Sequence, residues 1–214
     1  MDGYIAGFMS GILQTIIGQP LDTQKTAIQM GKKIGLRDML KGAKYAMINN
    51  ASQTSIMFGT NNLLEKNIGN SWFSGFITGI IGSPIVHISD RFKIARQLQI
   101  TYNYNLFLAM KGYWITLLRE SIGVSIYFGS YEYMKTINNS PLISGGISGT
   151  LSWLILHPID TIKTRMQVTN DFYGSLAKGN LSKGIFFSCS RGFIVNAVGF
   201  YSYEKMLILY ELYL

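Results

Sequence analysis

The stretch HPIDTIKTRMQ, residues 157–167, decides the fold of this chain, because its pattern stands twice more in the sequence. QPLDTQKTAIQ occupies residues 19–29, and HISDRFKIARQ occupies residues 87–97. In every copy an aspartate is followed three residues later by a lysine and seven residues later by a glutamine. A spacing that recurs three times at nearly even separation indicates an internal repeat.

The residues before each copy repeat as well. Each copy is preceded by a GxxxG pair, in which the small residues let two helix backbones approach closely. The pairs are Gly7 and Gly11, Gly75 and Gly79, and Gly145 and Gly149. Nine residues after the second glycine come Pro20, Ile88 and Pro158. The second copy lacks this proline, but Pro84 stands about one turn earlier and can supply the same kink.

A second pattern fills the other half of each repeat. It opens with Lys-Gly at residues 41, 111 and 183, and a phenylalanine follows 17 residues later, at Phe58, Phe128 and Phe200. The two patterns together divide the chain into three repeats, residues 1–69, 70–139 and 140–214.

The composition indicates a membrane protein. Hydrophobic residues make up 48% of the chain and charged residues only 14%, against about 25% charged in a typical soluble domain. Four stretches contain no Asp, Glu, Lys or Arg: 3–21, 45–64, 71–89 and 140–159. Each is close to the roughly 20 residues that span a bilayer. With the apolar stretches 112–136 and 184–209, they predict six spans, one face of which lines water.

The sequence resembles the mitochondrial carrier family. The three copies above are similar to that family's signature Px[DE]xx[KR]x[KR]xQ, and KGYWITLLRESIGVSIYFGSYE, residues 111–132, is similar to its fourth helix. The resemblance implies an all-α membrane protein, with six transmembrane helices in three pseudo-threefold repeats around a central cavity. Short helices on the matrix side are also implied. This chain would be a compact, divergent member, with only segments such as 35–40 and 103–110 left to form them.

The resemblance also implies a gate at the matrix end of the cavity. Its ion pairs would be Asp22 with Lys93, Asp90 with Lys163, and Asp160 with Lys25. Glutamines would brace the pairs, and the three prolines Pro20, Pro84 and Pro158 would let the odd-numbered helices bend. The braces are Gln29, Gln97 and Gln167.

The family's opposite, cytoplasmic gate is degenerate here. Its slots hold Asn62 with Glu65, Glu132 with Lys135, and Glu204 with Leu207. Pairing them around the ring leaves no ion pair, so we expect a resting state that is closed to the matrix and open to the cytosol. The alternative is a one-residue shift that brings Lys66 or Lys205 into the gate.

The family's substrate contacts lie on the even-numbered helices. The matching residues here are Asn49, Asn50, Gln53, Arg119, Glu120 and Arg191. Because guanidinium binds carboxylate bidentately, and Glu120 can accept an ammonium group, the substrate is expected to be amino-acid-like or a carboxylate. A nucleotide or deoxynucleotide is the alternative substrate. Arg119 and Glu120 could also only neutralise each other or a group on a neighbouring helix.

The expected protein is therefore a solute carrier of the mitochondrial inner membrane, an exchanger (antiporter) working by alternating access. Both termini would face the intermembrane space, although some relatives serve other organelles. We expect a monomer that binds a small molecule and the lipid bilayer, cardiolipin included, with no cofactor, no metal and no nucleic-acid polymer. The sequence shows no phosphate-binding glycine loop or other catalytic motif, which argues against an enzyme. An ungated channel and a degenerate carrier kept as a scaffold remain competing classes.

Overall fold

A computed structural model describes residues 2–29, 43–98, 112–169 and 185–213 of the chain. Side chains are described over most of these ranges, but not at 19–29, 43–46, 91–98, 164–169, 187, 211 or 213. The expected matrix-side helices at 35–40 and 103–110 lie outside the described residues.

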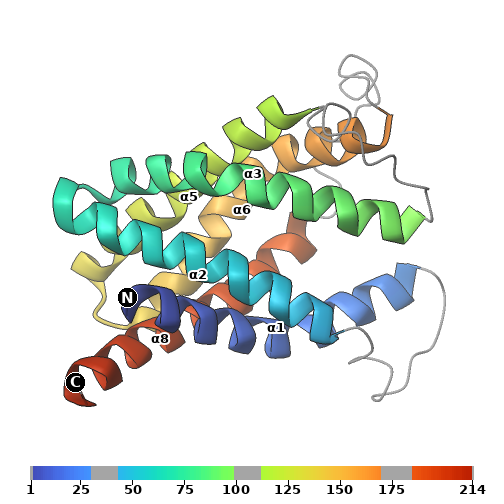
Figure 1. Ribbon diagram of the computed structural model, residues 1–214. Helices are drawn as coiled ribbons and strands as arrows, with labels where there is room; N and C mark the ends of the chain where they lie inside the picture. Colours follow the sequence, from blue (N-terminus) through green and yellow to red (C-terminus); the bar gives the residue numbers. More distant parts are fainter. Residues whose placement is uncertain (1, 30–42, 99–111, 170–184, 214) are drawn as a thin grey trace.

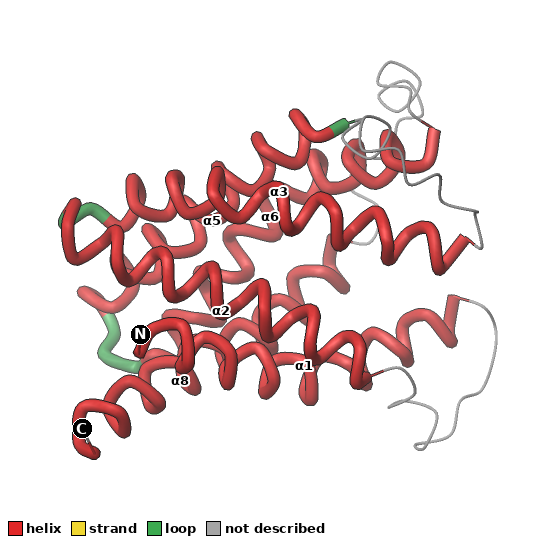
Figure 2. The backbone as a smooth tube through the Cα atoms, viewed as in Figure 1, coloured by secondary structure: helices red, strands yellow, loops and turns green. Residues whose placement is uncertain are grey.

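The described residues form six long helices, with no strand among them (Figures 1 and 2). They are α1 (Asp2–Gln29), α2 (Ala43–Ile68), α3 (Ser71–Leu98), α5 (Tyr113–Ile137), α6 (Pro141–Thr169) and α8 (Ile185–Tyr213). Each has 25 to 29 residues, and a rise of about 1.5 Å per residue makes each long enough to cross a bilayer. The six expected spans agree with these helices, except that three of them begin one residue before the helix does.

The helices form a closed ring in which the first, third and fifth helices (α1, α3 and α6) each pack along the next helix in the chain. The closest pairs are α1 with α2, α3 with α5, and α6 with α8, and α8 returns to pack on α1. Both termini lie at one end of this bundle with the turns at 69–70 and 138–140, which we call the terminal end (Figure 1). We call the opposite end the far end.

Glycines bring the helices of each pair into backbone contact. A Cβ added at Gly11 would lie 2.6 Å from Ala51 Cα, and one added at Gly79 would lie 2.4 Å from the Glu120 carbonyl oxygen. Real Cβ atoms do not approach other atoms so closely. The GxxxG pairs therefore have the close-packing role expected of them.

Hydrogen bonds join the pairs to one another across the ring. One crosses each of the three seams between pairs: Ser74 Oγ to Asn61 Oδ1 (3.0 Å), Ser152 Oγ to the Gly123 carbonyl (3.2 Å), and Ser10 Oγ to the Gly199 carbonyl (2.7 Å). Because such bonds replace those that water would make, they allow small polar residues to be buried at helix interfaces.

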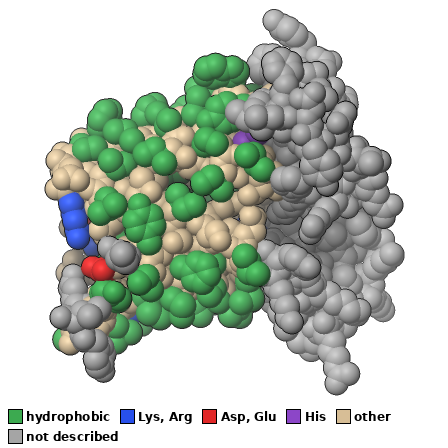
Figure 3. Space-filling view, in the orientation of Figure 1, with side chains coloured by type: hydrophobic (Ala, Val, Ile, Leu, Met, Phe, Trp, Pro, Cys, Tyr) green, Lys and Arg blue, Asp and Glu red, His purple; other side chains and the backbone are tan. Residues whose placement is uncertain are grey.

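The bundle is polar inside and apolar outside. The residues before the second glycine of each GxxxG pair, Ser10, Thr78 and Ser148, are all buried. Large hydrophobic side chains are instead exposed on every helix, and they cover much of the described surface in Figure 3. By length and mean hydropathy alone, only Ser71–Asp90 and Pro141–Lys163 qualify as membrane spans within the described residues. The polar interior face of the other helices lowers their mean hydropathy.

The three prolines lie inside helices. α1, α3 and α6 continue past Pro20, Pro84 and Pro158 respectively. A proline at such a position removes one backbone hydrogen bond and favours a bend. The hinge role of these positions stays a prediction.

Candidate functional site

An ion pair between α3 and α6 marks the far end of the interior. Lys163 Nζ lies 2.7 Å from Asp90 Oδ2, so this contact, which the family resemblance implied, is present. Lys163 is buried, with 8% of its side chain exposed. The other two expected pairs and the three glutamines involve Asp22, Lys25, Gln29, Lys93, Gln97 and Gln167, whose side chains lie outside the described residues.

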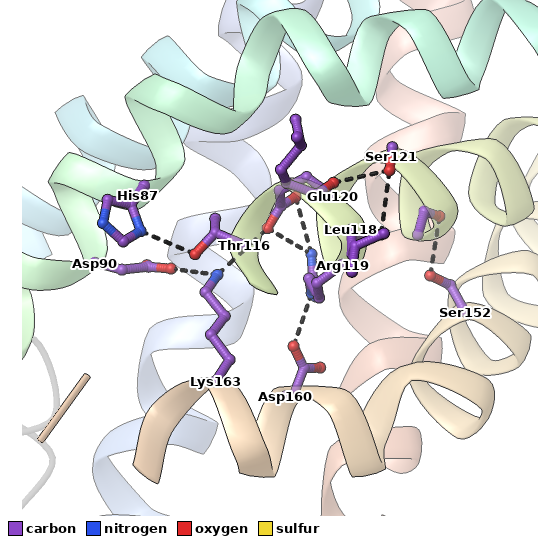
Figure 4. A network of polar contacts seen from close by, with 12 residues as sticks. His87, Asp90, Thr116, Leu118, Arg119, Glu120, Ser121, Ser152, Asp160 and Lys163 are labelled. Atoms are coloured by element: carbon purple, nitrogen blue, oxygen red, sulfur yellow. Dashed lines mark hydrogen bonds and ion pairs between the residues drawn. The ribbon is translucent and has the colours of Figure 1, made fainter. Parts of the chain in front are cut away.

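The same lysine connects the expected gate to the expected substrate site. Lys163 Nζ lies 3.4 Å from Glu120 Oε1, and Arg119 Nη1 lies 2.9 Å from the same carboxylate. Arg119 Nε then donates to Asp160 Oδ1 at 2.7 Å. Figure 4 shows Asp90, Lys163, Glu120, Arg119 and Asp160 as one chain of ion pairs, which we call the central network.

The central network is stabilised because its buried charges alternate in sign. Only 8% of the Glu120 side chain is exposed, as for Lys163, and 20% of the Arg119 side chain. An ionised group at such depth is costly unless it is paired and hydrogen-bonded. Removing one member would therefore leave its neighbours as uncompensated charges, which is the costly case.

The spacing of the motifs did not reveal that Arg119 bonds Asp160. The sequence offered neutralisation by a neighbouring helix as an alternative to substrate binding, and the structure contains both expected forms of it. Arg119 pairs with Glu120 on its own helix and with Asp160 on α6. One signal of this bond was available in the sequence. The resemblance placed Arg119 and Asp160 on helices that are neighbours in the ring, although it gave the two residues separate roles.

A buried histidine supports the network from α3. His87 is fully buried, and its Nδ1 lies 2.9 Å from Thr116 Oγ1 on α5. Its ring meets Tyr113 edge to face, and Tyr113 is in turn hydrogen-bonded to Ser83 at 2.8 Å. These contacts lock α3 to α5 within two turns of Asp90 and Glu120 (Figure 4).

The expected contact residues of α2 form hydrogen bonds with partners outside the central network. Asn50 donates to the Gly11 carbonyl and to Thr15 Oγ1, each at 3.1 Å, and so stitches α2 to α1. Gln53 donates to Asn49 at 3.4 Å on an exposed part of the helix. The structure therefore does not bring these amides together with Arg119 and Glu120.

Arg191 enters from α8 and lies against α1. A Cβ added at Gly18 would be 3.6 Å from Arg191 Nη2. This is ordinary van der Waals distance, so the guanidinium head lies close to the α1 backbone at Gly18. Arg191 is half-buried.

At the terminal end, the expectation that no ion pair survives is wrong. Lys135 Nζ lies 2.7 Å from Glu204 Oε1, and the Tyr131 hydroxyl donates to the same oxygen at 2.7 Å. Lys135 is also 3.9 Å from Glu132. The expected partner of Lys135, Asn62, instead donates to the Tyr203 hydroxyl at 3.1 Å. The lysine side chain has four methylene groups, so Lys135 can reach Glu204 on α8 instead of the partner that the family's pairing rule gives it on α2.

An aromatic triangle closes the same end. Phe58, Phe128 and Phe200, one from each repeat, have ring centroids 5.2, 5.2 and 5.9 Å apart and meet nearly edge to face. All three are at most 4% exposed. Tyr131 and Tyr203 stack on the triangle. The end that was expected to be open in the resting state is therefore closed in this structure, and aromatic packing does most of the closing.

A ring of six helices with a charged interior and an apolar exterior defines the class of helical membrane transporters. The family model described as "Mitochondrial carrier protein" matches residues 138–180. Curated relatives extend the likeness to nearly the whole chain. The mitochondrial arginine transporter BAC2 of Arabidopsis thaliana is 25% identical over 95% of this chain and 90% of its own length. The glutamate/glycine mitochondrial carrier ymc1 of Schizosaccharomyces pombe is 25% identical over 95% and 92%.

A third relative, the tricarboxylate transporter FUM11 of Gibberella moniliformis, is 29% identical over 89% of this chain and 76% of its own. No solved structure was found to match. The family model and these relatives are those of mitochondrial carriers, so this chain is similar over nearly its whole length to transport proteins rather than to enzymes. The alignment with the arginine transporter runs over 265 positions, although this chain has 214 residues. The relative therefore carries stretches with no counterpart here.

Proposed function

We propose that this protein exchanges a small amino-acid-like or carboxylate solute across the mitochondrial inner membrane by alternating access. The observation that carries the proposal is the pairing of Arg119 with Glu120 at the middle of the central network. The two adjacent side chains offer opposite charges, and each already bonds a group of opposite sign on another helix.

A solute bearing a carboxylate and an ammonium can replace those bonds one for one. Its carboxylate takes the place of Asp160 on Arg119, where a guanidinium can bind it in a bidentate manner. Its ammonium takes the place of Lys163 on Glu120. Arg119 and Glu120 stay paired in this exchange, and Lys163 keeps Asp90, so these three buried groups avoid the desolvation cost of an unpaired ion.

The exchange also couples the substrate to the gate. Asp160 and Lys163 belong to the signature motif of the third repeat, and Lys163 holds Asp90 of the second. A solute that releases Asp160 and Lys163 from α5 frees them to rearrange with the other signature residues. The relatives named for arginine, for glutamate and glycine, and for tricarboxylates fit a site that selects carboxylates.

The orientation belongs to the same proposal. Both termini lie at the terminal end (Figure 1). The aromatic triangle packs toward this end, which would face the intermembrane space. The structure then corresponds to a carrier closed toward the cytosol. Lipid contacts, including cardiolipin, would be made by the exposed apolar side chains, and the protein would work as a monomer.

The experiment begins with thermal shift of the purified protein in mild detergent with glycine, glutamate, arginine, citrate or ADP. A ligand that binds only the folded state raises the melting temperature. Uptake of each stabilising compound into loaded proteoliposomes follows. We expect an amino acid to give saturable exchange, and Arg119→Gln or Glu120→Gln to weaken it by about tenfold to a hundredfold.

Lys205→Gln serves as the matched control, because it removes a charge from an exposed position of α8. Stabilisation by ADP that needs Arg191 and is indifferent to Glu120 would contradict the proposed substrate and support a nucleotide. Flux that rises linearly with concentration would indicate a channel, and no flux with any compound would favour a scaffold.

A further inference from the structure

A tryptophan on α6 lies between the backbone of α8 at Gly192 and the Arg119 guanidinium of α5. A Cβ added at Gly192 would be 2.6 Å from Trp153 Cδ1 and 3.2 Å from its Nε1, so the indole rests directly on the backbone of α8. Gly192 follows Arg191 in the chain. On its other side, the Trp153 ring carries Arg119 Cζ 5.8 Å from its centroid. The indole thus extends from the α8 backbone to the guanidinium of α5.

This arrangement is absent from the other two repeats at the equivalent position. Four residues after the second glycine of each GxxxG pair stand Thr15, Ser83 and Trp153. Thr15 accepts a hydrogen bond from Asn50, and Ser83 is bonded to Tyr113. Only the third repeat has a large aromatic side chain there, opposite a glycine. A threefold packing role would not require this asymmetry.

Another tryptophan shows what packing alone looks like. Trp72 on α3 also lies on a glycine of its partner helix, since a Cβ at Gly129 would be 2.1 Å from its ring. Trp72 is 49% exposed and is near the terminal end, outside the central network. Trp153 is more buried than Trp72 and reaches an ionised group. The two residues share one packing pattern and differ in the contact with Arg119.

We propose that Trp153 is a positioning and specificity-determining residue that holds the Arg119 guanidinium in place while its carboxylate partner is exchanged. The attraction of a guanidinium to an indole acts through the ring face. The N–H groups of Arg119 lie in the guanidinium plane and bond Asp160 and Glu120 there. The contact with Trp153 can therefore persist when Asp160 leaves and a substrate carboxylate arrives.

The consequence concerns selectivity. With the indole beside Arg119, the guanidinium is held ready for a planar carboxylate bound through two parallel hydrogen bonds. This inference rests on the proposed function, because it requires that Arg119 contact the substrate.

The test compares Trp153→Leu and Trp153→Phe with Trp72→Leu in proteoliposome uptake of glycine, glutamate and arginine. We expect Trp153→Leu to raise KM about threefold to thirtyfold, with a smaller change in kcat, because a desolvated cation–π contact is lost. Trp153→Phe should recover part of the affinity. Trp72→Leu should leave KM unchanged. In the Arg119→Gln background Trp153→Leu should add nothing, because the tryptophan acts through that arginine.

A structural role would give a different pattern. Equal effects of Trp153→Leu and Trp72→Leu, or additive effects of Trp153→Leu and Arg119→Gln on KM, would overturn the inference while leaving the proposed function intact. Melting temperatures of all variants, measured without ligand, separate loss of folding from loss of affinity.

A fluorescence measurement separates the two proposals. In a Trp72→Phe, Trp114→Phe protein, Trp153 is the one remaining tryptophan of the sequence. We expect its emission to change when Arg119→Gln is added, with no ligand present. Unchanged emission would refute the contact and the inference with it. Changed emission together with unchanged uptake in Arg119→Gln would refute the proposed function and reduce Trp153 to a packing residue.

Discussion

Phe200→Ala should be among the most destabilising single substitutions at the terminal end. The Phe200 side chain is 1% exposed and meets Phe58, Phe128 and Tyr131 at centroid distances of 5.2, 5.9 and 3.5 Å. Truncation of a buried phenylalanine to alanine costs about 3–5 kcal/mol. For a domain of this size, 1 kcal/mol moves the melting temperature by about 2–4 °C, which predicts a fall of about 6–20 °C.

The assay is intrinsic tryptophan fluorescence during thermal unfolding in mild detergent. Leu209→Ala, at a 47% exposed position on the same helix, is the matched control and should change the melting temperature by less than about 2 °C. If Phe200→Ala and Leu209→Ala had the same melting temperature, the aromatic triangle would contribute little to stability, and our account of how this end is closed would be refuted. A second expected consequence is faster uptake from the terminal side in the surviving folded protein.

Two further predictions concern the interior. Gly79→Ala should destabilise the protein by about 1–3 kcal/mol, because the added Cβ would meet the Glu120 carbonyl. Gly82→Ala is the control and should be neutral or slightly stabilising, since nothing lies within 4 Å of that position. Equal melting temperatures of the two variants would contradict the close packing of α3 on α5. Lys163→Met should lower the melting temperature more than Asp90→Asn. Lys163 is buried and bonds two carboxylates, whereas 33% of the Asp90 side chain is exposed and its described ion pair is with Lys163. The reverse order of the two melting temperatures would show that Glu120 does not depend on Lys163.

The sequence predicted features that depend on position along a helix. Four of the six helices follow from charge-free stretches of bilayer length and two from apolar stretches that charged residues interrupt. The Asp90–Lys163 pair was implied by the family resemblance. Gly79 was expected to allow a close approach, and that expectation requires only that no side chain be present. Such features need no knowledge of where a flexible side chain will point.

The features that the sequence missed depend on the reach of long side chains. Lys135 pairs with Glu204, although the family's pairing rule gives it Asn62. The long side chain of lysine can reach several possible partners, and the hydrogen bond to a carboxylate is the strongest among them because both groups are ionised. Arg119 likewise selects Asp160 on the adjacent helix. A register argument compares equivalent positions only, and both contacts join positions that are not equivalent.

The asymmetry of the ring indicates how a compact carrier of this kind would read its substrate. In the first repeat, Asn50 is committed to α1 through bonds to Gly11 and Thr15, so its amide is part of the scaffold. Among the described side chains, the ion pair of Arg119 with Asp160 joins α5 to α6. A solute bound there would act directly on the junction of the second and third repeats. The first repeat would respond through the contacts of α1 with α8 and of α2 with α3, so we expect movement to begin at the α5–α6 seam.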